Sequence, residues 1–157
     1  MKIRPVPDGK QRRVCAVLMA ESEPWLTLGL TLRDCAAIVG DPSKEMYLAE
    51  IGGVIAGYIL IQMAGVLRGY IQIVVVKPEC RGKGVGRGLL RFAQKRIFRD
   101  EPNVFICVSS FNRRARKLYE SAGFAVIGEL KDYLVRGHSE LVLRKTIGPR
   151  SEFRPKR

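Results

Sequence analysis

Stretches of apolar residues alternate with polar turns along the chain and predict the middle of a sheet. Residues 44–51 and 54–64 are expected to form two strands, and the Gly52-Gly53 pair between them favours a tight hairpin turn with positive φ. Residues 68–77 are apolar almost throughout, which is typical of a central strand. A further apolar run at residues 103–109 is expected to return beside it through a crossover.

Apolar residues three or four positions apart predict four helices. The first covers residues 11–20, and Val14, Val17 and Leu18 share one side of it. The second follows Thr31, a residue suited to the N-cap, and runs to residue 39. The third is expected at residues 84–99, and its inward residues are Val85, Leu89, Phe92, Ala93 and Ile97. The fourth is expected at residues 112–122.

Further strands at residues 2–6, 124–134 and 139–146 complete the prediction, and the chain is long enough for one domain. The expected fold class is α/β (α+β), with a mixed, mostly antiparallel sheet of about seven strands and four helices. The domain is expected to cover residues 1–147. Residues 148–157 lack periodicity and are expected to form a basic, mobile tail.

Composition narrows the class of protein. No apolar stretch reaches the roughly 18 residues of a membrane span, and no signal peptide is recognisable, so a cytoplasmic location without membrane contact is expected. The four cysteines are widely spaced, and His138 is the single histidine. This pattern argues against a zinc site and a disulfide framework, and no metal is expected.

The formal charge of +13 favours either an acidic partner or a basic face that water covers. The solvated face is the preferred interpretation, because charge runs on helices usually face water. An acidic protein substrate, the ribosome or nucleic acid remain open as partners. Nucleic acid has the least support, because the sequence contains no recognition-helix pattern and no aromatic and basic sheet surface.

A glycine-rich turn at residues 81–86, Arg-Gly-Lys-Gly-Val-Gly, follows the apolar run at 71–76 and precedes an amphipathic segment. A strand, a glycine turn and a helix together make an anion site, because the backbone can approach closely and the first helical N–H groups point outward. The same pattern also occurs in turns that bind no ligand.

A second motif lies at residues 108–124, where Asn112, Ala115, Leu118-Tyr119 and Gly123-Phe124 are spaced as Asn-x-x-Ala-x-x-Leu-Tyr-x-x-x-Gly-Phe. Together, the two motifs resemble those of the GNAT superfamily of acyl-CoA N-acyltransferases. The pattern is most similar to that of the bacterial ribosomal-protein alanine N-acetyltransferases. The resemblance implies a V-shaped splay in the centre of the sheet and acetyl-CoA as cosubstrate.

The resemblance also implies which residues bind acetyl-CoA. The side chain of Asn112 is expected to reach the pantetheine, to cap a helix, or to do both. Arg81 is expected either to bind phosphate or to orient the turn. The implied cofactor-binding residues are Val74, Val75, Val76, Arg81, Gly82, Lys83, Gly84, Val85, Gly86, Arg87, Asn112 and Tyr119.

Tyr119 matches the family's general acid, which donates a proton to the departing thiolate; packing in the core is the alternative for this residue. The glutamate of the alanine N-acetyltransferases corresponds to Cys107, and a buried thiol is a poor proton acceptor. The general base is therefore unassigned: either another carboxylate acts through water, with Glu45, Glu50 and Glu140 as candidates, or the amine arrives neutral. Cys107 as a covalent nucleophile is the less favoured alternative, because a lone cysteine on an apolar strand is usually inert.

The acceptor pocket is expected between residues 25–29 and the last hairpin, with Trp25 and Tyr133 as substrate-binding residues. Trp25 could equally anchor a loop. The function predicted from the resemblance is transfer of an acetyl group from acetyl-CoA to a primary amine, by direct attack in a ternary complex. The acceptor could be a protein N-terminus, a lysine or a small amine. The alternatives are a catalytically silent acetyl-CoA sensor and a nucleic-acid- or ribosome-associated protein, and the protein could be a monomer or a homodimer.

Overall fold

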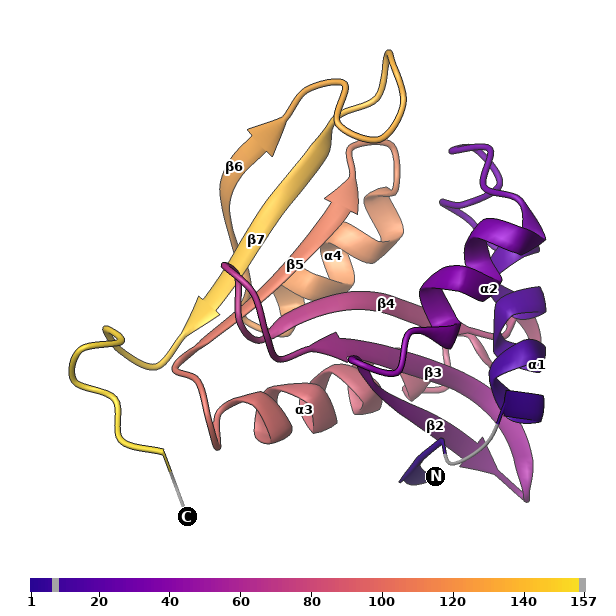
Figure 1. Cartoon of the computed structure of the whole chain (residues 1–157), viewed down its shortest axis with the longest axis horizontal. Helices are drawn as coiled ribbons and strands as arrows, with labels where there is room; N and C mark the ends of the chain where they lie inside the picture. Colours follow the sequence, from indigo (N-terminus) through magenta and orange to yellow (C-terminus); the bar gives the residue numbers. More distant parts are fainter. Residues whose placement is uncertain (7–8, 156–157) are drawn as a thin grey trace.

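The structure is a computed structural model that describes residues 1–6 and 9–155 (Figure 1). Seven strands form one sheet in the order β1-β2-β3-β4-β5-β7-β6. Neighbouring strands are antiparallel except for β4 and β5, which are parallel. The described residues also contain four α-helices, so the predicted mixed, mostly antiparallel fold class is confirmed.

The predicted elements are all present, although several of their ends differ. In chain order they are β1 (Lys2–Pro5), α1 (Gly9–Ala20), α2 (Leu32–Gly40), β2 (Glu45–Ile51), β3 (Val54–Gln62), β4 (Tyr70–Val76), α3 (Val85–Ile97), β5 (Asn103–Ser109), α4 (Arg113–Ser121), β6 (Ala125–Leu130) and β7 (Glu140–Thr146). The largest difference is in β6, where residues 131–134 belong to a loop rather than to the strand. A short 3-10 turn at Pro78–Cys80 was not predicted.

Local turn and cap signals are confirmed in detail. Gly52 and Gly53 have φ of 58° and 79° and join β2 to β3 in the expected hairpin. Thr31 caps α2, since its hydroxyl accepts from the Asp34 N–H while the Asp34 carboxylate accepts from the Thr31 N–H. These features depend only on neighbouring residues, which is why the sequence predicts them well.

Helices cover both faces of the sheet and enclose two cores (Figure 1). On one face, α3 and α4 pack over residues such as Ile59 and Ile106. On the other face, α1 and α2 pack over Leu48 and Tyr58. The predicted inward face of α3 is confirmed except for Phe92, which is half-buried against the ring of Tyr47.

The predicted apolar side of α1 is wrong for two of its three residues. Val14 and Val17 are exposed, Leu18 packs half-buried against the core as expected, and the buried residues are Cys15, Ala16 and Met19. The reason is packing of α1 against both the sheet and α2, where small Cys15 and Ala16 side chains allow a close approach that a β-branched valine would obstruct.

The sheet opens between its two parallel strands. β4 and β5 are paired only at Tyr70 with Phe105 and Ile71 with Ile106. The register of β4 against β3 then shifts at Gln72, which is a β-bulge. Beyond this bulge the two strands diverge (Figure 1), so the splay implied by the resemblance is present. The divergence leaves room for a cavity in the middle of the sheet.

Residues 148–155, the described part of the expected tail, contain a turn at 150–152, and residues 148–150 lie close to Asn103 at the start of β5. Arg150 contributes an ion pair to Glu101 at 3.4 Å. Mobility of this segment stays a prediction, and residues 156–157 of the expected tail lie outside the described residues.

Candidate active site

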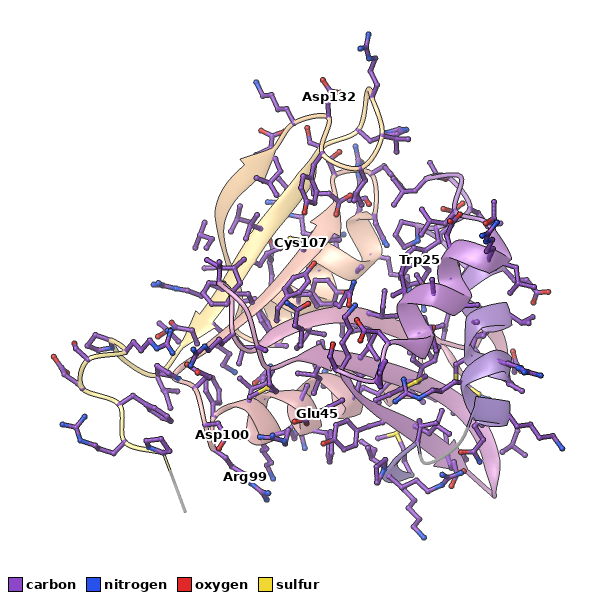
Figure 2. The ribbon with its side chains drawn as sticks, in the orientation of Figure 1. Trp25, Glu45, Arg99, Asp100, Cys107 and Asp132 are labelled. Atoms are coloured by element: carbon purple, nitrogen blue, oxygen red, sulfur yellow. The ribbon has the colours of Figure 1, made fainter. Side chains whose placement is uncertain are left out.

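A cavity of about 930 Å³ occupies the space between the diverging strands β4 and β5. Its walls also include the N-terminal ends of α3 and α4 and the loops α1–α2, β3–β4 and β6–β7. Trp25 and Cys107 lie on opposite sides of this opening (Figure 2). A cleft of this size, built from several elements, is large enough to enclose a sizeable ligand.

This cavity gathers nearly all of the residues that the sequence singles out. The predicted cofactor-binding, catalytic and acceptor residues that line it are Trp25, Val74, Val75, Val76, Arg81, Gly82, Gly84, Val85, Gly86, Arg87, Asn112, Tyr119 and Tyr133. Lys83 is exposed and does not line the cavity. Cofactor and acceptor residues predicted from separate segments therefore meet at one place.

The glycine turn before α3 has the backbone that an anion site needs. Gly82 and Gly84 have φ of 77° and 80°, and nothing lies within 4 Å of where a Cβ would stand at either residue. Gly84 is the N-cap of α3 and supplies no capping side chain, so the positive end of the helix faces the cavity. Both the open space and the orientation of the helix fit a pyrophosphate.

Two residues of this turn have structural roles as well. A Cβ at Gly86 would lie 3.0 Å from Leu118 Cδ2, so glycine allows α3 to pack closely against α4. Arg81 donates from Nε to the carbonyl oxygen of Val76 at 3.2 Å. This bond ties the glycine turn to the end of β4, which is the orienting role considered for Arg81.

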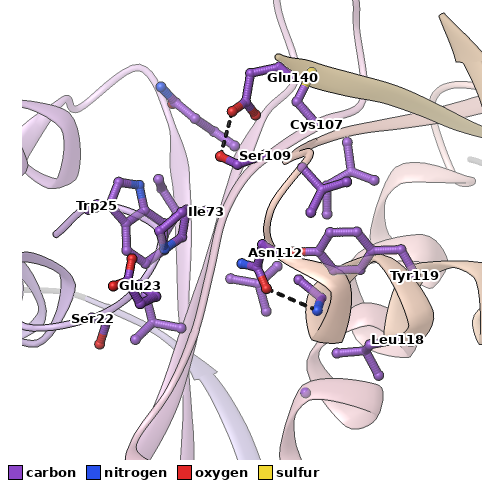
Figure 3. A pocket seen from close by; sticks show the side chains of 18 of the residues that line it. Ser22, Glu23, Trp25, Ile73, Cys107, Ser109, Asn112, Leu118, Tyr119 and Glu140 are labelled. Atoms are coloured by element: carbon purple, nitrogen blue, oxygen red, sulfur yellow. Dashed lines mark hydrogen bonds between the residues drawn. The ribbon is translucent and has the colours of Figure 1, made fainter. Parts of the chain in front are cut away.

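Asn112 is the N-cap of α4, as one of its predicted roles requires. Its Oδ1 accepts a hydrogen bond from the Ala115 N–H at 3.2 Å. The side-chain amide nitrogen keeps its two donors and lines the same cavity. Figure 3 shows the side chain between Tyr119 and the open space, so capping and ligand binding are compatible.

Tyr119 is the buried residue of α4, with 7% of its surface exposed, and its ring lies 6.4 Å from that of Phe124. Burial raises the pKa of Tyr119 well above that of a free phenol, and the nearby Glu140 carboxylate raises it further. The hydroxyl is therefore neutral at physiological pH and carries a proton that it can donate into the cavity.

Glu140 also lines this cavity, and its charge acts on Tyr119. It begins β7, is 5% exposed, and stands directly opposite Ser109 of β5. Ser109 Oγ donates a hydrogen bond to Glu140 Oε1 (Figure 3). Burial raises the pKa of Glu140 above that of an ordinary carboxyl, while the Ser109 hydrogen bond and His138 oppose the rise. A carboxylate with a raised pKa is a better proton acceptor.

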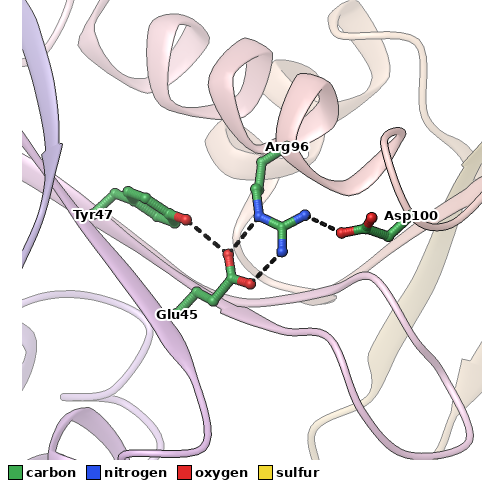
Figure 4. Close-up of polar contacts among 4 residues, drawn as sticks. All are labelled: Glu45, Tyr47, Arg96 and Asp100. Carbon is green, nitrogen blue, oxygen red and sulfur yellow. Dashed lines mark hydrogen bonds and ion pairs between the residues drawn. The ribbon is translucent and has the colours of Figure 1, made fainter. Parts of the chain in front are cut away.

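The other two glutamates considered as bases are held elsewhere. Glu45 accepts hydrogen bonds from both Arg96 and the Tyr47 hydroxyl, and Arg96 also pairs with Asp100 (Figure 4). Glu50 pairs with Arg4 at 2.6 Å. Neither carboxylate lines the cavity.

Cys107, which corresponds to the glutamate of the alanine N-acetyltransferases, lies in the cavity wall. Burial raises the pKa of its thiol, with a smaller contribution from Glu140, although a hydrogen bond from Tyr70 opposes the rise. The thiol is thus protonated and a poor base. Cys107 is opposite Val142 on β7, two residues from Glu140. The neighbouring strand β7 therefore brings the Glu140 carboxylate close to Cys107, where the glutamate of the alanine N-acetyltransferases is missing.

The expected acceptor residues lie on two different loops. Trp25 is half-buried in the α1–α2 loop and packs against the core beneath α1 and α2. Tyr133 is 63% exposed in the β6–β7 loop. Both line the cavity, so the loop-anchoring role and the substrate-binding role of Trp25 can coexist.

Sequence reasoning missed several cavity residues, among them Tyr70, Gln72 and Ser109. Tyr70 and Gln72 belong to a segment that reads as one apolar core strand, and its bulge has no sequence signal. Ser109 ends β5 inside the segment that carries the second motif, three residues before Asn112, and its only sequence signal is that a polar residue closes an apolar strand.

No cluster of three or more histidine, cysteine or acidic side chains suited to a metal occurs in the part of the chain that the structure describes. Among the helices of residues 1–6 and 9–155, none is long and apolar enough to cross a membrane.

The model of the acetyltransferase (GNAT) family matches residues 12–124, and the chain belongs to this family. Among curated proteins, it is 28% identical over 147 residues to mycothiol acetyltransferase of Beutenbergia cavernae, covering 82% of this chain and 50% of that protein. It is 34% identical over 105 residues to the uncharacterized N-acetyltransferase MJ1530 of Methanocaldococcus jannaschii, covering 63% and 64%. The chain thus spans less than two thirds of these relatives.

Solved structures of acetyltransferases share the fold. An aminoglycoside 6'-N-acetyltransferase in complex with coenzyme A superimposes with a TM-score of 0.75 at 16% identity, covering 96% of this chain and 99% of that one. The ribosomal-protein-S18-alanine N-acetyltransferase of Escherichia coli gives a TM-score of 0.72 at 18% identity, with 96% of each chain covered. At these identities the likeness concerns the fold alone.

Proposed function

We propose that this protein is an N-acetyltransferase that uses acetyl-CoA to acetylate a primary amine by direct attack in a ternary complex. The observation that carries the proposal is the meeting of Tyr119, Glu140 and the glycine turn of α3 in one cavity. Family membership and the relatives named as acetyltransferases support it. Acetyl-CoA is the co-substrate that supplies the activated acetyl group.

The residues of the cavity divide into those that bind the co-substrate and those that move protons. The N–H groups at the start of α3, with Gly82 and Gly84, hold the pyrophosphate. The edge of β4 beyond Ile71, which no longer pairs with β5, offers backbone groups to the pantetheine and an N–H to the thioester carbonyl. Asn112 adds its side-chain amide.

Glu140 accepts the proton of the attacking amine, directly or through one water, and Ser109 holds the carboxylate in place. The bond between nitrogen and the acetyl carbon forms as the bond between carbon and sulfur breaks. Tyr119 gives its proton to the sulfur, so the leaving group departs as a neutral thiol. The two protonation states, a neutral phenol and an ionisable carboxylate, are those that this exchange requires.

The alternative function is a catalytically silent acetyl-CoA sensor. Its main support is Cys107, which stands where the alanine N-acetyltransferases have a glutamate. Glu140 provides a carboxylate in the same cavity, and this observation favours catalysis over sensing.

Steady-state kinetics test the direct-attack mechanism. With both substrates varied, double-reciprocal plots should intersect, and Cys107→Ser should keep its activity because the thiol is protonated and takes no part. Parallel lines together with an acetylated Cys107 would instead establish a covalent route.

A further inference from the structure

The acceptor end of the cavity is apolar, and this property narrows the amine that the proposed acetyltransferase accepts. Three loops surround this end: residues 21–31, 63–69 and 131–139. Large apolar side chains from all three line the cavity, namely Trp25, Leu28, Val66, Leu67, Tyr133 and Leu134. Trp25 faces the catalytic side of the cavity (Figure 3).

Several of these side chains are exposed, with Val66 96% and Tyr133 63% accessible. Exposed apolar groups that converge on one cavity mark a surface that a ligand covers. Backbone hydrogen bonds lie within the first loop, from the Leu28 N–H to the Pro24 carbonyl oxygen, and across the ends of the second, from the Gly69 N–H to the Gln62 carbonyl oxygen. The third loop has a side-chain hydrogen bond and a ring contact. The Gly137 N–H donates to Asp132 Oδ1 at 2.6 Å, and the His138 ring lies 5.0 Å from that of Phe111. The apolar rim is thus held in place before a ligand binds.

Charge is distributed unevenly along the cavity. Among the described residues that line it, the cations Arg81, Arg87 and Arg114 lie at the end formed by α3 and α4. The carboxylates are Glu140 and Glu23, and Glu23 already accepts from the Thr27 N–H at 3.3 Å. Glu140 is the buried carboxylate of this lining and can pair with one ammonium group, whereas Glu23 is exposed. A polycation with three or more ammonium groups would exceed these two carboxylates and leave charges against apolar side chains and a protein of charge +13.

A hydrogen-bond acceptor in the wall lacks a partner. Gln72 lies at the bulge of β4 and lines the cavity, and its Oε1 is buried with no hydrogen bond in the structure. Buried amide oxygens are costly to leave unpaired. A donor on the bound acceptor molecule would satisfy this oxygen.

We propose that the acceptor is a singly charged primary amine on an apolar body, with a second N–H group that donates to Gln72. This inference rests on the proposed acetyltransferase function and specifies its substrate class. An apolar amino-acid amide and the N-terminus of a peptide that begins with an apolar residue share this chemistry. Polyamines and aminoglycosides do not.

Thiol release from acetyl-CoA, measured with five amines, tests the substrate class. Phenylalaninamide and a peptide that begins with phenylalanine should have a kcat/KM at least about tenfold above those of spermidine and kanamycin. Phenethylamine, which lacks the second donor, should lie between. The better of the first two identifies the source, a small molecule or a peptide. Preference for spermidine or kanamycin would overturn the inference and leave the acetyltransferase function intact. Release with none of the five would overturn both.

Variants of the rim test the role of the loops. Val66→Asp should raise the KM for phenylalaninamide by about tenfold and leave acetyl-CoA binding unchanged. Val54→Asp is the matched control, because Val54 is 62% exposed at the start of β3 and does not line the cavity. An equal effect of both substitutions would contradict the assignment of the rim.

Gln72→Leu separates hydrogen bonding from structure. It should lower kcat/KM about fivefold for phenylalaninamide, since one neutral hydrogen bond is lost, and leave phenethylamine unchanged. An equal loss for both amines would indicate a merely structural role and refute the assignment of Gln72.

Discussion

Replacing Glu140 with glutamine removes the proposed base while keeping its shape. Ser109 can still donate to the amide oxygen, so the β5–β7 contact survives. Loss of general-base catalysis typically costs 10²–10⁴-fold, and we expect kcat for Glu140→Gln to fall by about 10²-fold or more at neutral pH. The KM for acetyl-CoA should change little, because the glycine turn is untouched.

The rate of acetyl transfer by Glu140→Gln should also depend on pH differently from the wild-type rate. Because burial raises the pKa of Glu140, the acidic limb of the wild-type rate profile should lie above the ordinary carboxyl value, and the variant should lack it. The deficit should narrow near about pH 9–10, where more of the amine is already neutral.

Glu140 should make the folded protein less stable as pH rises, whereas a salt-bridged carboxylate makes it more stable. A raised folded-state pKa means that the folded protein binds more protons than the unfolded chain just above the ordinary carboxyl pKa, so wild-type stability falls as pH rises through that range. Glu140→Gln lacks this loss and should be at least as stable as wild type at neutral pH.

Rates and thermal denaturation at several pH values check these expectations. Glu50→Gln is the control, because Glu50 pairs with Arg4 away from the cavity. A wild-type rate and an unchanged pH profile for Glu140→Gln would exclude Glu140 as the general base.

Other substitutions probe the remaining parts of the site and fold. Tyr119→Phe should lower kcat by about 10²-fold with little change in acetyl-CoA affinity measured by calorimetry, and equal turnover would exclude the general acid. Gly84→Ala forces a side chain into φ of 80° beside the proposed pyrophosphate site, so it should lower the free energy of unfolding in urea by about 1 kcal/mol and weaken acetyl-CoA binding about tenfold. Arg96→Met breaks the partly exposed network around Glu45 and should cost about 1 kcal/mol while leaving kcat unchanged; a loss of activity would connect that network to the site.

The sequence predicted those turns and helix caps whose geometry depends only on residues adjacent in the chain. The glycine turn, the Asn112 cap and the Gly52-Gly53 hairpin each need only a few adjacent residues to define their geometry. The two motifs contain most of the proposed co-substrate-binding residues for the same reason, since each one surrounds a helix N-terminus.

The sequence could not single out Glu140, the proposed general base, because the position of this residue depends on strand register. Glu140 and Ser109 are 31 residues apart and meet only when β7 pairs with β5. The bulge at Gln72 and the buried side of α1 likewise depend on tertiary packing rather than on periodicity. A hydrophobic pattern cannot show which side of a helix a neighbour will cover.

Amine-dependent release of thiol from acetyl-CoA by the wild-type protein is the most direct test of the proposed acetyltransferase function. We expect acetyl-CoA to bind in calorimetry and thiol release to accompany acetylation of an added primary amine. Binding of acetyl-CoA without release on any amine would contradict catalysis, and no binding at all would contradict the assignment of the cavity.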